Sequence, residues 1–327
     1  MKRKPLWTGI GACAGMLILI LDGKSALDGA RTGIDLCLKT VIPSLFPFFV
    51  LSILLTSSLA GSFLPVLRPL GKLCGIPEGT ESILLCGFLG GYPVGAQSVT
   101  SAYRSGQLSK TEAERMLAFC NNAGPAFLFG MAASVFNRQW MAWVLWGIHI
   151  ASALTAAQFF PGNYAQRVTL SSKNQTSVTS ALNMAIRVMA SVCGWVILFR
   201  VMITFLTRWV LWVFPKAVQV GIIGFLELSN GCCELIALPD GTMRFLLCSG
   251  MLAFGGLCVT MQTLSVTGGL SLRHYFSGKL LQTLFSLLLA AAVVCGAGLP
   301  CCAALLLFTL ILRKTRKKSS IRQVVGV

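Results

Sequence analysis

The sequence predicts an all-α integral membrane protein with about eight transmembrane helices. Of its 327 residues, 55% are apolar and only 11% are charged, whereas a soluble domain carries about 25% charged residues. Several apolar stretches reach the roughly 20 residues that a helix needs to cross a hydrocarbon core about 30 Å thick. Most of the Lys and Arg residues lie between these apolar stretches rather than inside them. Together these observations favour a polytopic membrane protein over a soluble globular one.

The strongest predicted spans are residues 41–60, 116–136, 139–160, 181–206, 243–270 and 276–298. Residues 7–21 follow the basic start Lys2-Arg3-Lys4 and are interpreted as a retained signal anchor. A cleaved secretory signal is the alternative, because Ala26 and Ala30 supply small residues downstream of the apolar stretch. Residues 299–312 are predicted to form a short last span.

The net charge of +17 fits the positive-inside rule better than nucleic-acid binding. We therefore predict a multi-pass cell-membrane protein with both termini in the cytoplasm. The basic tail from Arg313 to Arg322 is expected to bind anionic lipid, with no nucleic acid as partner. The predicted inside segments hold these basic residues besides the tail: Lys2, Arg3, Lys4, Arg68, Lys72, Arg104, Lys110, Arg115, Arg167, Lys173, Arg273 and Lys279.

An internal duplication organises the chain. In each unit a span is followed by a Gly-rich stretch containing Gly-Phe-Leu, then by a span with a polar break and by a plain span. We predict three crossings and one re-entrant hairpin per unit, and an odd number of crossings inverts the second unit. The predicted domains are an N-terminal anchor and amphipathic connector (1–33), a first repeat (34–160), a cytoplasmic linker (161–180), a second repeat (181–298), and a last helix with basic tail (299–327).

The Gly-rich stretch of the first unit is a candidate solute site. Backbone without helical partners cannot face lipid, so irregular backbone at depth must line protein or a watery cavity. We predict a hairpin whose tip presents backbone N–H groups; close helix packing through small residues is the alternative. The candidate residues are Gly90, Gly91, Tyr92, Pro93 and Gly95.

Asn121 and Asn122 stand side by side within a predicted span, just before the break at Gly124-Pro125. Carboxamides both donate and accept hydrogen bonds, and proline removes a backbone donor and ends the helix. The pair with Gly124 is therefore predicted to bind a polar solute. Hydrogen bonding between helices is the alternative.

In the second unit the matching polar group is "ELSNG", with Glu227, Ser229 and Asn230. A carboxylate at membrane depth costs about 2.5–3.5 kcal/mol, so it needs a role or a partner. The functional interpretation is coupling to H⁺ or Na⁺; the alternative is a salt bridge to Arg187 or Arg200. Gln262 is a further candidate binding residue, near Thr260, Thr263 and Ser265.

No catalytic, metal or cofactor site is predicted, and the protein is not expected to be an enzyme. The two histidines, His149 and His274, are not at ligand spacing to any cysteine, and no CxxC occurs. His149 is predicted to be a packed interfacial residue. Trp140, Trp143 and Trp146 follow helical spacing and predict an aromatic belt.

Five segments resemble the sporulation integral membrane proteins of the YlbJ type, which carry the nucleoside-recognition or Gate domain. They are "IPSLFPFFVLSILL" (42–55), "GFLGGYPVGAQ" (87–97), "LSKTEAERMLAFCNNAGPAFLFG" (108–130), "GFLELSNG" (224–231) and "FGGLCVTMQ" (254–262). The resemblance implies two Gate-like repeats and a role in moving dipicolinate during endospore formation, in the mother-cell-derived membrane around the forespore. A nucleoside-type transporter and a non-transporting scaffold for spore assembly are the alternatives.

Overall fold

The computed structural model describes residues 4–59, 64–136, 138–162, 164, 176–298, 300–302 and 304. The described chain folds into α-helices with short 3₁₀ and π turns and contains no strand. By length and composition, five helical segments of the described part can cross a membrane: Gly23–Leu59, Gln139–Ala157, Val178–Trp209, Thr242–Thr267 and Arg273–Val294. Shorter apolar helices cover Gly9–Leu21, Pro125–Phe136 and Lys216–Leu226. This confirms a multi-pass, all-α membrane protein.

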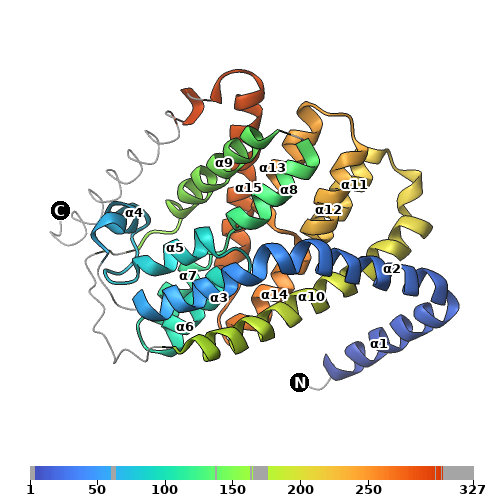
Figure 1. Cartoon of the computed structure of the whole chain (residues 1–327), viewed down its shortest axis with the longest axis horizontal. Helices are drawn as coiled ribbons and strands as arrows, with labels where there is room; N and C mark the ends of the chain where they lie inside the picture. Colours follow the sequence, from blue (N-terminus) through green and yellow to red (C-terminus); the bar gives the residue numbers. More distant parts are fainter. Residues whose placement is uncertain are drawn as a thin grey trace.

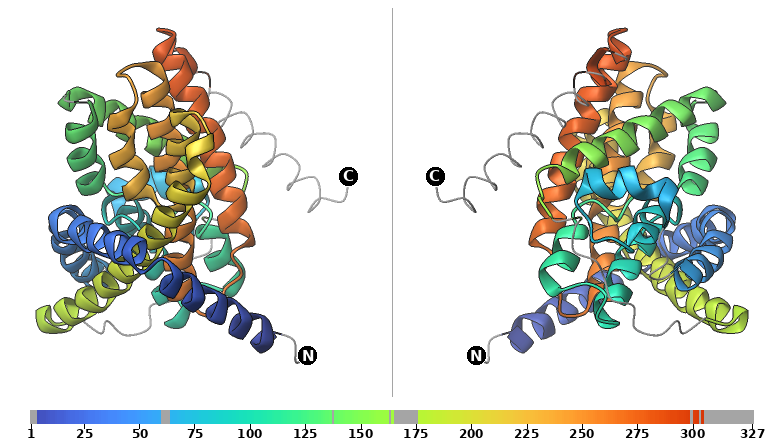
Figure 2. Two further views of the ribbon diagram at one scale, coloured as in Figure 1. Left: turned by 90° about the vertical axis from the view of Figure 1, so that its right-hand side faces the viewer. Right: turned by 90° about the vertical axis from the view of Figure 1, so that its left-hand side faces the viewer.

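The N-terminal helix α1 (Lys4–Leu21) lies at the edge of the molecule, where Ile20 and Leu21 are exposed. Figures 1 and 2 show it extending away from the helical body. The predicted boundary at residue 33 is not a helix break, because α2 (Gly23–Leu36) continues through a π turn into α3 (Ile42–Leu59). This continuous helix lies along α10 (Val178–Trp209).

The rest of the first half contains a helical hairpin, an interrupted helix and a long helix. A short helix α4 (Arg68–Cys74) precedes the hairpin, which consists of α5 (Glu81–Leu89) and α6 (Val94–Arg104). The span predicted at 116–136 is interrupted as expected, since α7 (Lys110–Met116) and α8 (Pro125–Phe136) are separated by residues 117–124. The half closes with α9 (Gln139–Ala157).

The second half follows the same order after α10. Its hairpin is α11 (Lys216–Leu226) and α12 (Leu228–Glu234), and its interrupted helix is α13 (Thr242–Phe254) and α14 (Gly256–Thr267). Gly255, with a φ of 84°, separates these two helices. The half closes with α15 (Arg273–Val294). The predicted linker 161–180 and last span 299–312 lie largely outside the described residues, and the basic tail lies wholly outside them.

The two halves pack against each other through corresponding helices. The first long helices α3 and α10 touch, as do the closing helices α9 and α15. The second arm of each hairpin packs on the second part of the other half's interrupted helix, which places α6 against α14 and α12 against α8. Because both helix interruptions face this contact, irregular backbone from both halves meets in the core.

Candidate functional site

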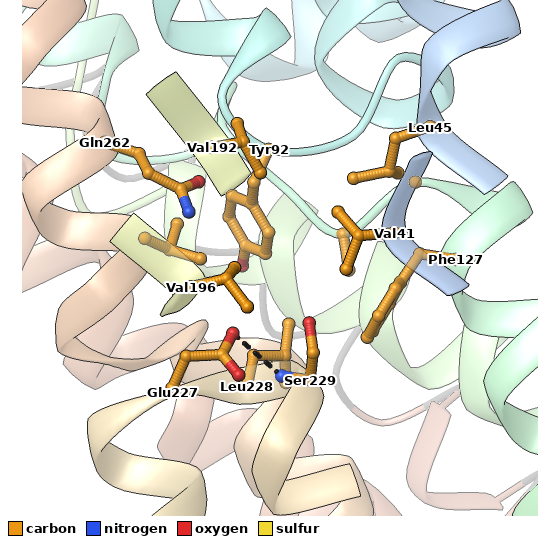
Figure 3. Close-up of a pocket in the computed structure, with 13 residues that line it drawn as sticks. Val41, Leu45, Tyr92, Phe127, Val192, Val196, Glu227, Leu228, Ser229 and Gln262 are labelled. Carbon is orange, nitrogen blue, oxygen red and sulfur yellow. Dashed lines mark hydrogen bonds between the residues drawn. The ribbon is translucent and has the colours of Figure 1, made fainter. Parts of the chain in front are cut away.

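A pocket lies where the two halves meet, and both halves line it. The volume open to the centre of a water molecule is about 30 Å³, which is room for roughly two waters. Figure 3 shows the Tyr92 ring above the Glu227 carboxylate, with Gln262 to one side and Phe127 to the other. The lining residues are Val41, Leu45, Tyr92, Ala123, Gly124, Phe127, Val192, Val196, Glu227, Leu228, Ser229, Val259 and Gln262.

Five of the twelve predicted site residues line this pocket: Tyr92, Gly124, Glu227, Ser229 and Gln262. They come from the hairpin tip and the helix interruption of the first half, and from the hairpin and interrupted helix of the second. The structure therefore brings together residues up to 170 positions apart, from Tyr92 to Gln262.

At the hairpin tip between α5 and α6, only one predicted residue lines the pocket. The N–H of Gly90 donates to the Cys86 carbonyl (2.9 Å), and the N–H of Val94 donates to that of Gly91 (2.8 Å). Gly90, Gly91, Pro93 and Gly95 do not line the pocket, whereas the ring of Tyr92 does.

Glycine in the hairpin also serves close packing. A Cβ atom on either Gly87 or Gly95 would overlap the carbonyl of Cys120, which lies between the two hairpin arms. In the second hairpin, a Cβ on Gly231 would overlap Gly224 in the same way. Close backbone approach, which was the alternative interpretation of these Gly-rich stretches, therefore occurs in both hairpins.

Asn121 and Asn122 are fully buried and hydrogen-bonded within the protein. Asn121 donates to the Thr263 hydroxyl (2.9 Å) and accepts from the Ala96 N–H (3.3 Å), so it joins the two halves. Asn122 donates to the Phe119 carbonyl (2.7 Å) and accepts from Gln282 (2.9 Å). In this state the pair connects helices, which was the alternative reading of the sequence.

Glu227 accepts hydrogen bonds from three N–H groups at the start of α12. Its carboxylate binds the backbone N–H of Ser229 (3.0 Å) and both the backbone (2.7 Å) and side-chain (2.6 Å) nitrogens of Asn230. Hydrogen bonds of this kind stabilise a buried carboxylate. The predicted alternative, a salt bridge from Glu227 to Arg187 or Arg200, is wrong. Arg200 donates to the side-chain oxygen of Asn230 (3.0 Å), and Arg187 lies with Ser177 and Asn183 at another surface.

Gln262 projects into the pocket from α14. Its amide nitrogen lies 3.3 Å from the Cys258 sulfur, one turn earlier on the same helix. Because sulfur is a weak acceptor, this amide N–H can exchange it for a stronger acceptor in the pocket. Gln262 therefore combines pocket exposure with hydrogen-bonding capacity more directly than either asparagine.

One buried lysine was not among the predicted site residues. Lys279, assigned above to a cytoplasmic loop, lies on α15 and is 1% exposed. Its ammonium donates to the side-chain oxygen of Gln282 (2.8 Å) and to the Tyr92 hydroxyl (3.0 Å). The available signal was a lysine inside the span predicted at 276–298, with a glutamine one turn later on the same face.

His149 on α9 is packed in the core, as predicted. Its Nε2 accepts the N–H of Ala123 at 3.1 Å. The histidine thereby satisfies a backbone donor in the interruption between α7 and α8. Trp140 and Trp143, on the same helix, are exposed as expected of an aromatic belt.

These features define the class: a polytopic α-helical membrane protein whose two packed halves enclose a polar core and a small central pocket. The sporulation integral membrane protein YlbJ of Bacillus subtilis (strain 168) is 25% identical to the chain over 328 aligned positions, covering 82% of this chain and 77% of that protein. This similarity confirms the predicted resemblance to the YlbJ type. No family model matches the chain. No solved structure matches it either.

Proposed function

We propose that the chain is a transporter, rather than an enzyme, that moves a small polar or anionic metabolite across a membrane through the pocket of Figure 3. One observation carries the proposal: Tyr92 and Gly124 reach this pocket from the interruptions of the first half, and Glu227 and Ser229 from the hairpin of the second. Solute sites of secondary transporters lie between repeats, beside interrupted helices.

The shared order of elements supports an architecture of two inverted Gate-like repeats, 34–160 and 181–298, with about eight crossings. The reciprocal packing of α6 on α14 and of α12 on α8 is what a pseudo-two-fold axis would produce, and on this proposal the axis lies in the membrane plane. On this proposal the hairpins α5–α6 and α11–α12 are re-entrant. Both termini are cytoplasmic, and the basic tail binds anionic lipid.

The pocket in this structure is too small for a solute with a ring. With room for roughly two waters, the pocket cannot hold a dicarboxylate or a nucleoside without rearrangement. Alternating access supplies such rearrangement through movement of one repeat against the other. On this proposal, the solute enters the pocket only after such a movement.

The proposed solute is dipicolinate, moved across the mother-cell-derived membrane around the forespore; nucleosides are the alternative. The sporulation name of the relative supports the setting. Glu227 is the candidate for H⁺ or Na⁺ coupling, because it is the acidic residue of the pocket lining.

Uptake by purified protein in proteoliposomes tests the proposal. We expect dipicolinate to accumulate in response to a pH or Na⁺ gradient, and Glu227→Gln to abolish the gradient dependence while leaving the fold intact. Glu234→Gln is the matched control, since Glu234 ends the helix that Glu227 caps but pairs with Lys216 at the surface. Uptake that is absent for both dipicolinate and nucleosides would contradict the proposal.

A cellular comparison separates transport from scaffolding. A transporter needs its polar core, so Asn121→Leu with Asn122→Leu should block dipicolinate delivery to the spore. A scaffold needs its loops, so deletion of residues 163–178 should be the more damaging change. Loss of function on the deletion alone would favour the scaffold.

A further inference from the structure

Lys279 carries a feature that the proposed transport site does not yet explain. Its ammonium is buried on α15, and none of the ion pairs between described residues includes it. Both of its hydrogen-bond partners, the side-chain oxygen of Gln282 and the Tyr92 hydroxyl, are neutral. The ammonium also lies 4.9 Å from the centre of the Tyr92 ring.

A buried cation without a counter-ion is costly. Removing an ammonium from water costs several kcal/mol, and neutral acceptors recover only part of that cost. Within membrane helices, such residues mark solute or ion pathways by default. We therefore interpret the absence of an acidic partner as a sign that Lys279 binds an anionic ligand, rather than that it stabilises the fold.

The surroundings hold Lys279 in one place. The side chain of Gln282 accepts from Lys279 through its oxygen. Its amide nitrogen donates to the side-chain oxygen of Asn122 (2.9 Å) and lies 3.4 Å from the backbone carbonyl oxygen of His149. Asn122 is in turn fixed by the Phe119 carbonyl. This network connects α15 to the interruption between α7 and α8, so the ammonium is positioned by groups from three segments of the core.

Tyr92 separates this ammonium from the pocket. Its ring lines the pocket, while its hydroxyl accepts from Lys279 and donates to the Leu252 carbonyl (3.2 Å). None of the lining residues is cationic, and the Glu227 carboxylate is one of them. The Glu227 carboxylate is already bound by three N–H groups. The cation nearest to an anion in this pocket along Tyr92 is Lys279, which contacts the Tyr92 hydroxyl.

We propose that Lys279 is the residue that recognises a carboxylate of the transported solute, and that this carboxylate takes the position that the Tyr92 hydroxyl has beside the ammonium in this structure. When solute binds, the carboxylate replaces the phenol oxygen as acceptor of the Lys279 ammonium and supplies the missing counter-charge. This inference rests on the proposed function and narrows its substrate class to carboxylate anions, which excludes nucleosides.

Ligand binding to the full-length protein in detergent tests the inference without requiring transport. The probes are dipicolinate, its neutral diamide, and isophthalate, which keeps both carboxylates but lacks the chelating ring nitrogen. We expect both dianions to raise Tm in the wild type, with the diamide weaker. Lys279→Met should weaken dianion binding at least tenfold and change diamide binding little.

Two further variants keep the test independent of folding. Lys279→Met removes an unpaired charge, so its Tm without ligand should match or exceed that of the wild type. Tyr92→Phe keeps the lysine and the ring but removes the competing hydroxyl, so dianions should bind several-fold more tightly. Lys110→Met is the control at an exposed lysine.

The outcomes separate this inference from the transport proposal. Dianion binding that depends on Lys279, in a protein that takes up no solute, would uphold the anion site and contradict transport. Equal loss of dianion and diamide binding in Lys279→Met, unchanged dianion binding in that variant, or no dianion binding by the wild type would overturn the anion site.

Discussion

Gly95 shows how a single side chain limits the geometry of the core. It lies on α6 opposite the Cys120 carbonyl, where a Cβ atom has no room because the neighbour is backbone and cannot rotate away. Gly87 faces the same carbonyl from α5. The interruption that carries Asn121 and Asn122 is therefore held between the hairpin arms by the absence of two side chains.

We expect Gly95→Ala to lower the free energy of unfolding by about 3 kcal/mol, since overpacking a rigid site costs 1–3 kcal/mol or more. Gly147→Ala on α9 is the matched control, because an added Cβ there meets no atom within 4 Å. Thermal unfolding in detergent measures both. Equal Tm values for the two variants would show that the α6 contact is not rigid.

At the scale of elements, Arg115 ties together helix ends that lie far apart in the sequence. On α7, it donates to the carbonyls of Cys74 (3.1 Å) and Gly75 (2.9 Å) at the end of α4, and to that of Phe160 (3.0 Å) after α9. Carbonyls at helix C-termini lack partners within the helix and carry partial negative charge. The planar guanidinium reaches them from two separate nitrogens in a fixed geometry, whereas an ammonium has all its donors on a single nitrogen.

Arg115→Lys should therefore destabilise the protein by about 2 kcal/mol, although the charge is kept. Arg273→Lys provides the comparison, since Arg273 is exposed at the start of α15. Denaturation in detergent, followed by helical circular dichroism, gives the difference. A smaller loss at Arg115 than at Arg273 would refute the role of the fork geometry.

At the scale of the whole molecule, each half completes the core of the other. The closing helices α9 and α15 pack together, and so do α3 and α10. Asn121 from the first half binds Thr263 of the second, and Lys279 of the second binds Tyr92 of the first. Either half alone would expose these polar groups to lipid, where their desolvation is unfavourable.

We expect a chain divided between residues 170 and 171 to reassemble when both fragments are produced together. A tag on one fragment should then recover the other in detergent, and the complex should unfold as one unit. Each fragment produced by itself should aggregate. A first fragment that is monodisperse and helical without its partner would contradict mutual dependence of the halves.

Much of the secondary structure and part of the site could be predicted from sequence. The interruption at Gly124-Pro125 was visible because proline cannot continue a helix, and the hairpin tip was visible in its glycines. Tyr92, Glu227 and Gln262 stood out as polar or aromatic groups in apolar surroundings, and all three line the pocket. Lys279 was not predicted as a site residue, because a lysine near the predicted end of a span fits a cytoplasmic loop as well as a buried position.

The sequence by itself determined the class of protein and the approximate positions of its long apolar helices and of the break at Gly124-Pro125, because hydropathy, proline and glycine act on local backbone whatever lies nearby. Only the tertiary structure decided which polar groups pair. Asn121 bonds a residue 142 positions away, and Lys279 one 187 positions away. Such partners depend on the packing of the two halves, and no local pattern encodes that packing.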